Sequence, residues 1–170
     1  RVLFRSEALG RAGARVLVAG RNEEKLLERV RAIEAVGGEA FRCLVDVARA
    51  EDVETLHKEA TQRLGRVDVL INGAGVNSAT PYFDIAREDW SRVLNVNLTA
   101  MHETCQRFGK DMVEQRSGSI INIASISAGV PLSKVFAYAA SKAAVVNYTQ
   151  NLARELGPFG VRVKIGRAHV

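Results

Sequence analysis

Short runs of apolar residues alternate along this chain with segments whose apolar residues recur at helical spacing. Such runs are typical of buried strands, and the segments between them are typical of amphipathic helices. Strands are predicted at 15–20, 40–45, 67–71, 119–124 and from 161 onward. The alternation predicts an α/β fold of three layers, in which helices cover both faces of a doubly wound parallel sheet.

Capping and breaking residues mark the ends of the predicted helices. Asn22 is expected to cap a helix that ends at Gly37–Gly38, and Gly65 is expected to end the next helix. The two longest helices are predicted at about 88–113 and 136–156. No run of apolar residues is long enough to cross a bilayer, so a membrane partner is not expected.

The two ends of the chain look foreign to it. Arg1–Ser6 can be encoded by the DNA word CGTGTGCTCTTCCGATCT, and the reverse complement of this word encodes Ile165–His169. The word resembles a sequencing adapter, and segments of such origin are excluded from fold reasoning. We therefore expect one native domain at 7–163, incomplete at both ends, flanked by adapter-derived residues at 1–6 and 164–170.

Composition excludes some classes of function once these ends are set aside. The 170 residues include 24 Lys and Arg against 19 Asp and Glu, but four of the basic residues lie in the ends. The interior is therefore nearly neutral, which removes any argument for nucleic-acid binding. The three histidines and two cysteines show no metal-ligand spacing, and the two distant cysteines fit a reducing, cytoplasmic setting.

A tyrosine and a lysine in the helix predicted at 136–156 are the first candidates for chemistry. Tyr138 and Lys142 are four residues apart, so they share one face of the helix. A fixed ammonium favours the phenolate form of a nearby phenol, which makes the phenol a usable acid and base near neutral pH. The same two residues could also share a face by chance, so the motif needs support from the rest of the chain.

Polar residues and glycines directly follow the predicted strands. In open parallel sheets, ligands bind beyond the carboxyl ends of the strands. The residues expected at that edge are Arg21, Asp46, Asn72, Gly73, Ala74, Gly75 and Ser125. We expect Tyr138 and Lys142 to meet them there, because their helix begins at the same edge.

With these motifs in place, the chain resembles the short-chain dehydrogenase/reductase family, nicotinamide-dependent enzymes with a Rossmann sheet. The resemblance covers essentially all of residues 7–163. It rests on the joint order of Asp46-Val47, Asn72-Gly-Ala-Gly75, Asn97-Leu98, Ser125 thirteen residues before Tyr138, and Tyr138-Ala-Ala-Ser-Lys142. Gly73 departs from the family pattern, which commonly has a second Asn there, and so removes one side-chain hydrogen bond.

The resemblance implies a role for each matching residue. Tyr138 would be the general acid and base that exchanges a proton with the substrate oxygen. Lys142 would favour the phenolate and hydrogen-bond the nicotinamide ribose, while Ser125 would hold and orient the substrate oxygen. Asn97 would anchor a water molecule that links Lys142 to solvent.

Two of these assignments have rivals among neighbouring residues of the same type. Ser125 could merely turn the chain at the end of a strand, and Ser127 is the alternative serine, although the spacing to the tyrosine favours Ser125. Asn97 could be a satisfied buried amide, and Asn95 is the alternative; the Leu-Thr that follows Asn97 favours Asn97.

The cofactor can be inferred from the end of the first predicted strand. A strand that carries the adenosine ribose of NAD(H) commonly ends in Asp or Glu, but here Arg21 follows the strand. A guanidinium suits a 2′-phosphate, so NADP(H) is expected over NAD(H), with a solvated Arg21 as the alternative. By the resemblance, Asp46 and Val47 would flank the adenine, and Asn72–Gly75 would let the backbone approach the cofactor.

The resemblance implies an oxidoreductase that interconverts a secondary alcohol and a ketone by hydride transfer. Segments 108–112, 131–135 and 147–150 look most like sugar-acid or polyol dehydrogenases of the gluconate type. A 3-oxoacyl-carrier-protein reductase is the alternative, and a non-catalytic cofactor-binding protein or inactive fragment is the alternative of another class. A homodimer or homotetramer is expected, joined through the helices at 88–113 and 137–156.

The family's first strand and its glycine-rich turn would precede residue 7, and its substrate-covering helix and last strand would follow residue 163. In the family's strand order, that first strand lies between the strands at 15–20 and 67–71. We therefore expect an interruption in the sheet between these two strands. The 170-residue chain is expected to be poorly stable and inactive, so the function given above is that of the parent protein.

Overall fold

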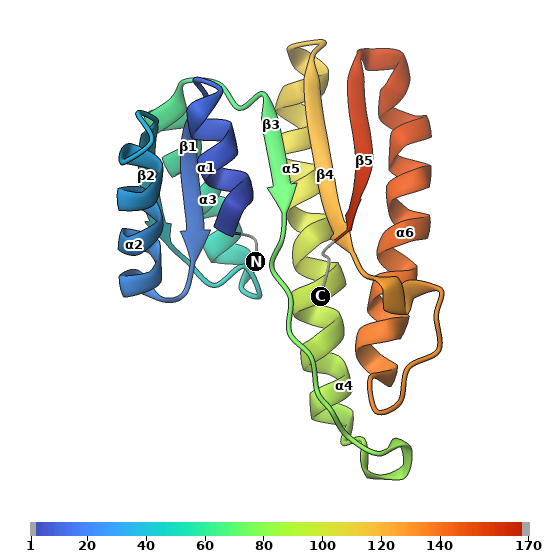
Figure 1. The fold of residues 1–170 in the computed structure, drawn as a ribbon. Helices are drawn as coiled ribbons and strands as arrows, with labels where there is room; N and C mark the ends of the chain where they lie inside the picture. Colours follow the sequence, from blue (N-terminus) through green and yellow to red (C-terminus); the bar gives the residue numbers. More distant parts are fainter. Residues whose placement is uncertain (1–2, 168–170) are drawn as a thin grey trace. The chain divides into compact units, whose positions relative to one another are not determined.

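The computed structural model describes residues 3–167, in which helices and strands alternate as predicted (Figure 1). The chain forms two compact units that divide after Val67, and each unit has its own parallel sheet. Within the described residues no strand pairs with strands of both sheets. This agrees with the expected interruption between the strands predicted at 15–20 and 67–71.

The first unit is built on two parallel strands, β1 (Arg15–Gly20) and β2 (Glu39–Leu44). Helices α1 (Leu3–Arg11), α2 (Glu23–Glu34) and α3 (Ala50–Leu64) pack on these strands, and α1 also packs on α2. The buried apolar side chains come from the helix faces that the sequence pattern predicts and from β2 and the residue after it; they are Leu26, Ile33, Cys43, Val45, Val53, Leu56 and Ala60.

The predicted caps of the first unit are confirmed. The side chain of Asn22 accepts a hydrogen bond from the backbone N–H of Lys25 at 2.9 Å, which satisfies one free donor at the start of α2. The backbone N–H of Gly65 donates to the carbonyl of Thr61 and closes the end of α3. Short-range chemistry therefore sets both helix boundaries.

The second unit has three parallel strands in the order β3 (Val69–Asn72), β4 (Gly118–Ala124) and β5 (Val161–Arg167). Helices α5 (Ala100–Glu114) and α6 (Phe136–Leu156) pack on these strands. Their buried side chains form an apolar core with β4 and β5, and the largest fully buried ones include Phe108, Met112, Ile120, Val145 and Val161.

The helix predicted at about 88–113 is one rod with a change of hydrogen bonding inside it. Helix α4 (Arg87–Leu94) is followed by a π-helical segment, Asn95–Thr99, and then by α5. Such π segments occur mostly as single turns inside α-helices and often at functional sites. The one seen here contains Asn97, a buried residue that sequence motifs had already singled out.

A chain of buried amide and hydroxyl groups joins the core strands of the second unit. The side chain of Asn72 donates to Asn122 Oδ1 at 2.8 Å and accepts from Thr104 Oγ1 at 2.8 Å. Asn122 in turn donates to Thr149 Oγ1 at 3.1 Å. Cys105 lies in the same cluster, and burial raises the pKa of its thiol to about 12. The cluster satisfies polar groups that would otherwise be costly in the core.

The ends of the described chain belong to regular elements. Helix α1 begins at Leu3, and β5 continues to Arg167 in register with β4. The adapter origin of residues 1–6 and 164–170 remains a prediction, and residues 1–2 and 168–170 of these segments lie outside the described residues.

Gly160 lies in the turn between α6 and β5 and has a left-handed backbone conformation. Gly160 has φ +78°, and a Cβ there would lie 2.5 Å from the carbonyl oxygen of Arg116. We expect Gly160→Ala to lower the free energy of unfolding by about 2 kcal/mol or more, because it adds left-handed strain and a backbone clash. Chemical denaturation measures the change.

Gly129→Ala is the matched control for this substitution. A Cβ at Gly129 would meet no atom within 4 Å, and its φ of −137° is accessible to alanine. The control is expected to change the free energy of unfolding by no more than about 0.5 kcal/mol. Equal unfolding midpoints for the two variants would show that the turn at Gly160 tolerates a side chain.

Candidate active site

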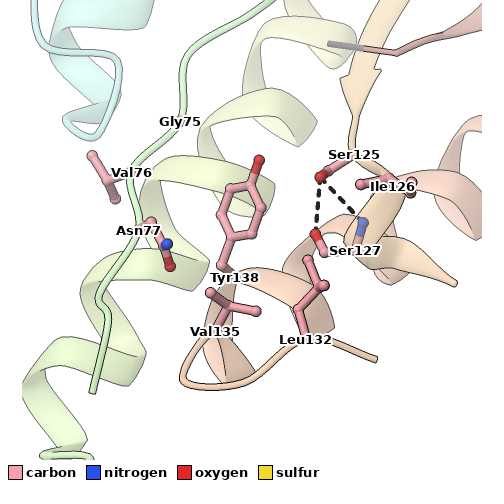
Figure 2. A pocket seen from close by; sticks show the side chains of 9 residues that line it. All are labelled: Gly75, Val76, Asn77, Ser125, Ile126, Ser127, Leu132, Val135 and Tyr138. Carbon is pink, nitrogen blue, oxygen red and sulfur yellow. Dashed lines mark hydrogen bonds between the residues drawn. The ribbon is translucent and has the colours of Figure 1, made fainter. Parts of the chain in front are cut away.

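A pocket of about 320 Å³ opens in the second unit beyond the carboxyl ends of β3 and β4 (Figure 2). Three segments meet there: the chain after β3, the chain after β4, and the approach to α6 together with its first turn. The lining residues are Gly75, Val76, Asn77, Ser125, Ile126, Ser127, Leu132, Val135 and Tyr138. Carboxyl ends of parallel strands share one edge of a sheet, which brings these segments together.

Two serines occupy one wall of the pocket. Ser125 directly follows β4 and caps a short 3₁₀ turn, Ile126–Ala128. Ser127 lies within that turn, and its backbone N–H and its hydroxyl both donate to Ser125 Oγ, at 3.3 and 2.9 Å (Figure 2). Both side chains are nearly buried, with 7% and 5% of Ser125 and Ser127 exposed.

Tyr138 and Lys142 are arranged as their spacing predicts. Figure 2 shows the Tyr138 ring between Asn77 and the serine pair. One turn further along α6, Lys142 is buried, and its Nζ donates to the carbonyl of Ile123 in β4 at 2.7 Å. This Nζ lies 5.7 Å from the centroid of the Tyr138 ring. Burial lowers the pKa of Lys142 from its ordinary value.

Asn97 ties the π segment to two other parts of the second unit. Its Oδ1 accepts from the backbone N–H of Val76 at 2.8 Å, and its Nδ2 donates to the carbonyl of Val76 at 3.0 Å. The same Nδ2 donates to Ser141 Oγ in α6 at 3.0 Å. The rival Asn95 is exposed, so the structure brings Asn97 rather than Asn95 to the site.

The chain after β3 passes close to these groups. A Cβ at Gly75 would lie 3.5 Å from Asn97 Oδ1 and 3.7 Å from Lys142 Nζ. Asn72 directs its side chain into the core cluster and not into the pocket. Gly73 and Ala74 continue from Asn72 toward Gly75, so this segment offers mainly backbone to the site, as predicted for a close approach to a ligand.

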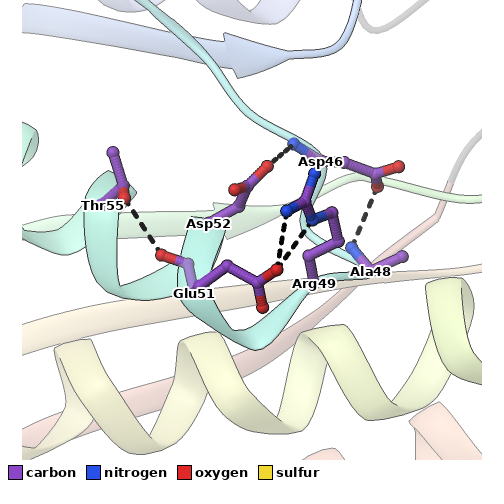
Figure 3. Close-up of polar contacts among 6 residues, drawn as sticks. All are labelled: Asp46, Ala48, Arg49, Glu51, Asp52 and Thr55. Atoms are coloured by element: carbon purple, nitrogen blue, oxygen red, sulfur yellow. Dashed lines mark hydrogen bonds and ion pairs between the residues drawn. The ribbon is translucent and has the colours of Figure 1, made fainter.

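The remaining predicted residues belong to the first unit. Arg21 follows β1 and Asp46 follows β2, and their side chains approach with Nη1 and Oδ2 3.5 Å apart. Asp46 also accepts from the backbone N–H of Ala48, and its own N–H donates to Asp52 Oδ2 at 2.7 Å (Figure 3). The Arg21 side chain is 62% exposed, and Val47 is half-buried beside Asp46.

These residues fit a nicotinamide cofactor at two places. In the second unit, Gly75 leaves open the space beside Lys142 Nζ, which donates one of its three protons to the carbonyl of Ile123 and could donate the others to a ribose. In the first unit, Arg21 makes a single long contact and presents most of its guanidinium to solvent, where it could bind a 2′-phosphate. No carboxylate stands at position 21 to bind a free 2′-hydroxyl.

Sequence motifs did not identify the apolar part of the lining. Val76 and Ile126 face the pocket but belong to no motif, and their only signal is that each follows a strand. Leu132 and Val135 lie in segment 131–135, which resembles sugar-acid dehydrogenases, but no site role was expected for them. The contact between Ser127 and Ser125 also needed the structure, since a 3₁₀ turn brings the second hydroxyl back to the first.

Known proteins resemble this chain over most of its length. A family model described as short chain dehydrogenase matches residues 4–166. The 3-oxoacyl-acyl-carrier-protein reductase FabG of Chlamydia pneumoniae is 33% identical over 151 residues, which cover 89% of this chain and 61% of that protein.

No helix in the described part of the chain is long and apolar enough to cross a membrane.

Solved structures of other proteins also resemble this chain. An NAD+-bound xylitol dehydrogenase matches with a TM-score of 0.92 at 28% identity, over 96% of this chain and 63% of that one. A protein from Beutenbergia cavernae, provisionally described as an NAD(P)-dependent gluconate 5-dehydrogenase with NADP bound at low occupancy, matches with a TM-score of 0.89 at 36% identity. That match covers 97% of this chain and 66% of the other. The chain therefore spans 61–66% of the length of these three proteins.

Proposed function

Since this chain belongs to the short-chain dehydrogenase family, we propose that it carries the catalytic centre of an NADP(H)-preferring enzyme that interconverts a ketone and a secondary alcohol. One observation carries the proposal. Ser125 and Tyr138 face a single pocket, and the buried ammonium of Lys142 is fixed one helical turn from Tyr138. The activity belongs to the whole protein, of which this chain contributes the catalytic side chains.

The proposed chemistry assigns one task to each side chain. When bound, the nicotinamide cofactor supplies or accepts the hydride at the substrate carbon. In ketone reduction, the Tyr138 hydroxyl gives its proton to the substrate oxygen as the C–H bond forms, and in alcohol oxidation the phenolate oxygen of Tyr138 takes a proton from the substrate hydroxyl. Ser125 donates a hydrogen bond to the same oxygen and holds it beside Tyr138.

Lys142 acts on Tyr138 and on the cofactor without touching the substrate. Its ammonium donates a hydrogen bond to the carbonyl of Ile123, which fixes the position of the charge although the lysine side chain is long and flexible. We propose that this fixed positive charge faces Tyr138 during proton transfer, with Nζ 5.7 Å from the centroid of the ring. The free protons of Nζ are available to the nicotinamide ribose. Asn97 holds the segment at Val76 against α6, and we propose that a water bound near it connects Lys142 to solvent.

The proposed substrate is a sugar acid or polyol, or its keto form. Support comes from the likeness to proteins described as xylitol and gluconate dehydrogenases. A 3-oxoacyl thioester is the second candidate, favoured by the four aliphatic side chains in the pocket lining and by the reductase of Chlamydia pneumoniae. A panel of a keto-sugar acid, a ketose and a 3-oxoacyl thioester separates these classes by relative kcat/KM.

NADPH oxidation by the full-length protein with this panel tests the enzyme assignment. We expect oxidation of NADPH that depends on the added ketone. A preparation that binds NADPH but turns over none of the panel, nor the matching alcohols with NADP+, would favour a cofactor-binding protein without activity. Sequencing the source DNA across both ends of this chain supplies the full-length protein, and we expect a strand with a glycine-rich turn to be encoded upstream.

Arg21 is the residue proposed to select NADP(H). We expect Arg21→Ala to raise the KM for NADPH by about 10-fold to 100-fold, because a charge-assisted contact to the 2′-phosphate is lost. The KM for NADH is expected to stay within about twofold, since NADH carries no such phosphate. Steady-state kinetics with both cofactors measure the ratio.

Arg31→Ala is a matched control for this prediction, because Arg31 is an exposed arginine of α2 in the same unit. The control variant should leave the KM values for both cofactors unchanged. Equal effects of Arg21→Ala on NADPH and NADH would assign Arg21 to the solvated surface and would remove the argument for NADP(H).

Two further proposals concern the assembly of the protein and its cellular setting. The helices α4 to α5 and α6 are proposed to form the contacts of a homodimer or homotetramer, and light scattering of the full-length protein tests this. A cytoplasmic setting is proposed because Cys43 and Cys105 are both buried free thiols, which suit a reducing compartment.

A further inference from the structure

Ser127 is placed to control the direction of the Ser125 hydroxyl. A serine hydroxyl has one proton to donate and two lone pairs with which to accept. Ser125 Oγ accepts from the backbone N–H and from the hydroxyl of Ser127, at 3.3 and 2.9 Å. Both lone pairs of Ser125 Oγ are thereby used inside the protein. Only the hydroxyl proton of Ser125 is left to bond a ligand in the pocket that both serines line (Figure 2).

We propose that Ser127 is a positioning residue that holds Ser125 as a hydrogen-bond donor to the substrate oxygen. This inference rests on the proposed function, and it adds a residue to which no role had been assigned. In the absence of the Ser127 hydroxyl, Ser125 Oγ keeps a free lone pair and its hydroxyl can rotate. Part of the population then presents an acceptor where the reaction needs a donor.

A hydrogen-bond donor that is held in a fixed direction favours this reaction. Reduction of a ketone turns a carbonyl oxygen into a hydroxyl, and negative charge gathers on that oxygen until the proton of Tyr138 arrives. Donors that already point at the developing charge stabilise the transition state more than the ground state. A hydroxyl that itself accepts a hydrogen bond is also a stronger donor, because hydrogen bonds in a chain polarise one another.

The turn that carries the two serines does not need the Ser127 hydroxyl for its shape. The backbone N–H of Ala128 donates to the carbonyl of Ser125, and that of Gly129 donates to the carbonyl of Ile126, each at 3.2 Å. The N–H of Ser127 still reaches Ser125 Oγ when the side chain is shortened. We therefore expect Ser127→Ala to keep the fold and to change only the second hydrogen bond to Ser125.

Ketone reduction by the full-length protein tests the proposal. Ser127→Ala is expected to lower kcat by about tenfold, the usual effect of losing one neutral hydrogen bond. The dissociation constant for NADPH and the melting temperature should not change, and Ser127→Thr, which keeps a hydroxyl, should restore most of the rate. Ser133→Ala removes an exposed hydroxyl from the loop before α6 and is the matched control, expected to have no effect.

A double-mutant cycle separates positioning from a structural role. If Ser127 acts through Ser125, then Ser127→Ala has no further effect on kcat in a Ser125→Ala background. A loss of kcat in the double variant that equals the product of the two single losses would overturn the proposal. Weaker NADPH binding by Ser127→Ala alone would overturn it as well.

A readout without turnover keeps this inference distinct from the enzyme assignment. In a neutron crystal structure of Ser127→Ala, we expect the hydroxyl hydrogen of Ser125 to occupy more than one position, and in the unaltered protein a single one directed into the pocket. One unchanged hydrogen position in the variant would overturn the positioning role whether or not a ketone is reduced. Failure of the unaltered protein to reduce any ketone, with the change of hydrogen position present, would instead count against the proposed function alone.

Discussion

Tyr138→Phe is expected to lower kcat for ketone reduction by about 10²–10⁴-fold, because the variant keeps the ring and loses the group that transfers the proton. The ring of Tyr138 stands in the pocket beside the serine pair, so removal of one oxygen leaves the shape of the pocket almost unchanged. NADPH binding should stay within about twofold. Steady-state kinetics and fluorescence titration of NADPH measure the two effects separately.

Tyr82→Phe is the matched control for this variant. Tyr82 is an exposed residue whose ring packs on Phe136, and it carries the same phenol group without lining the pocket. The control is expected to retain full activity. Substantial turnover by Tyr138→Phe would mean that another group, or solvent, supplies the proton, and the assigned mechanism would be withdrawn.

Lys142→Met is expected to lower kcat by about 10²–10³-fold while leaving the protein about as stable as before. The activity falls because the fixed positive charge beside Tyr138 is lost. At neutral pH the free energy of unfolding should change by no more than about 1 kcal/mol. Removal of a charge from a buried site offsets the loss of the hydrogen bond to Ile123.

The pH dependence of stability gives this prediction a second readout. Burial lowers the pKa of Lys142 below the ordinary value of 10.5, so the unfolded chain binds more protons than the folded chain between the two pKa values. The folded state therefore gains stability relative to Lys142→Met as the pH rises through the folded pKa toward 10.5. Below the folded pKa the lysine is charged in both states, and the cost of its burial is fully present.

Lys110→Met controls for the general loss of a lysine, since Lys110 is an exposed residue of α5. It should alter neither the activity nor the pH dependence. Unfolding curves at several alkaline pH values measure the difference between the Lys142 variant and the unaltered protein. If the free energy of unfolding changes with pH in the same way in Lys142→Met and in the unaltered protein, Lys142 is not desolvated by folding. A normal kcat in Lys142→Met would remove Lys142 from the mechanism.

The order of elements could be predicted from the sequence because it depends on local patterns. Periodicity placed every strand to within two residues, and Asn22 and Gly65 marked helix ends through contacts with residues three or four positions away. The spacing of Tyr138 and Lys142 put them on one helix face for the same reason. Within the second unit, the meeting of Gly75, Ser125 and Tyr138 was predictable because parallel strands bring the residues that follow them to a common edge.

Other features depend on contacts between residues far apart in the chain. The carbonyl that holds Lys142 lies in β4, nineteen residues before it. Asn97 bonds to Val76 and Ser141 from a π segment that breaks an otherwise regular helical pattern. Asn72 turns into the core because Thr104 and Asn122 offer it partners there.

The sequence by itself thus determined which elements form, their order, and which residue types reach the edge of the sheet, since propensity, periodicity and capping act over a few residues. Only the tertiary structure decided which atoms meet there: the ammonium of Lys142 with a strand carbonyl, and the hydroxyl of Ser127 with Ser125. A hydrogen bond depends on distances to within a few tenths of an ångström. Helix packing and strand register set those distances, and no short stretch of sequence encodes them.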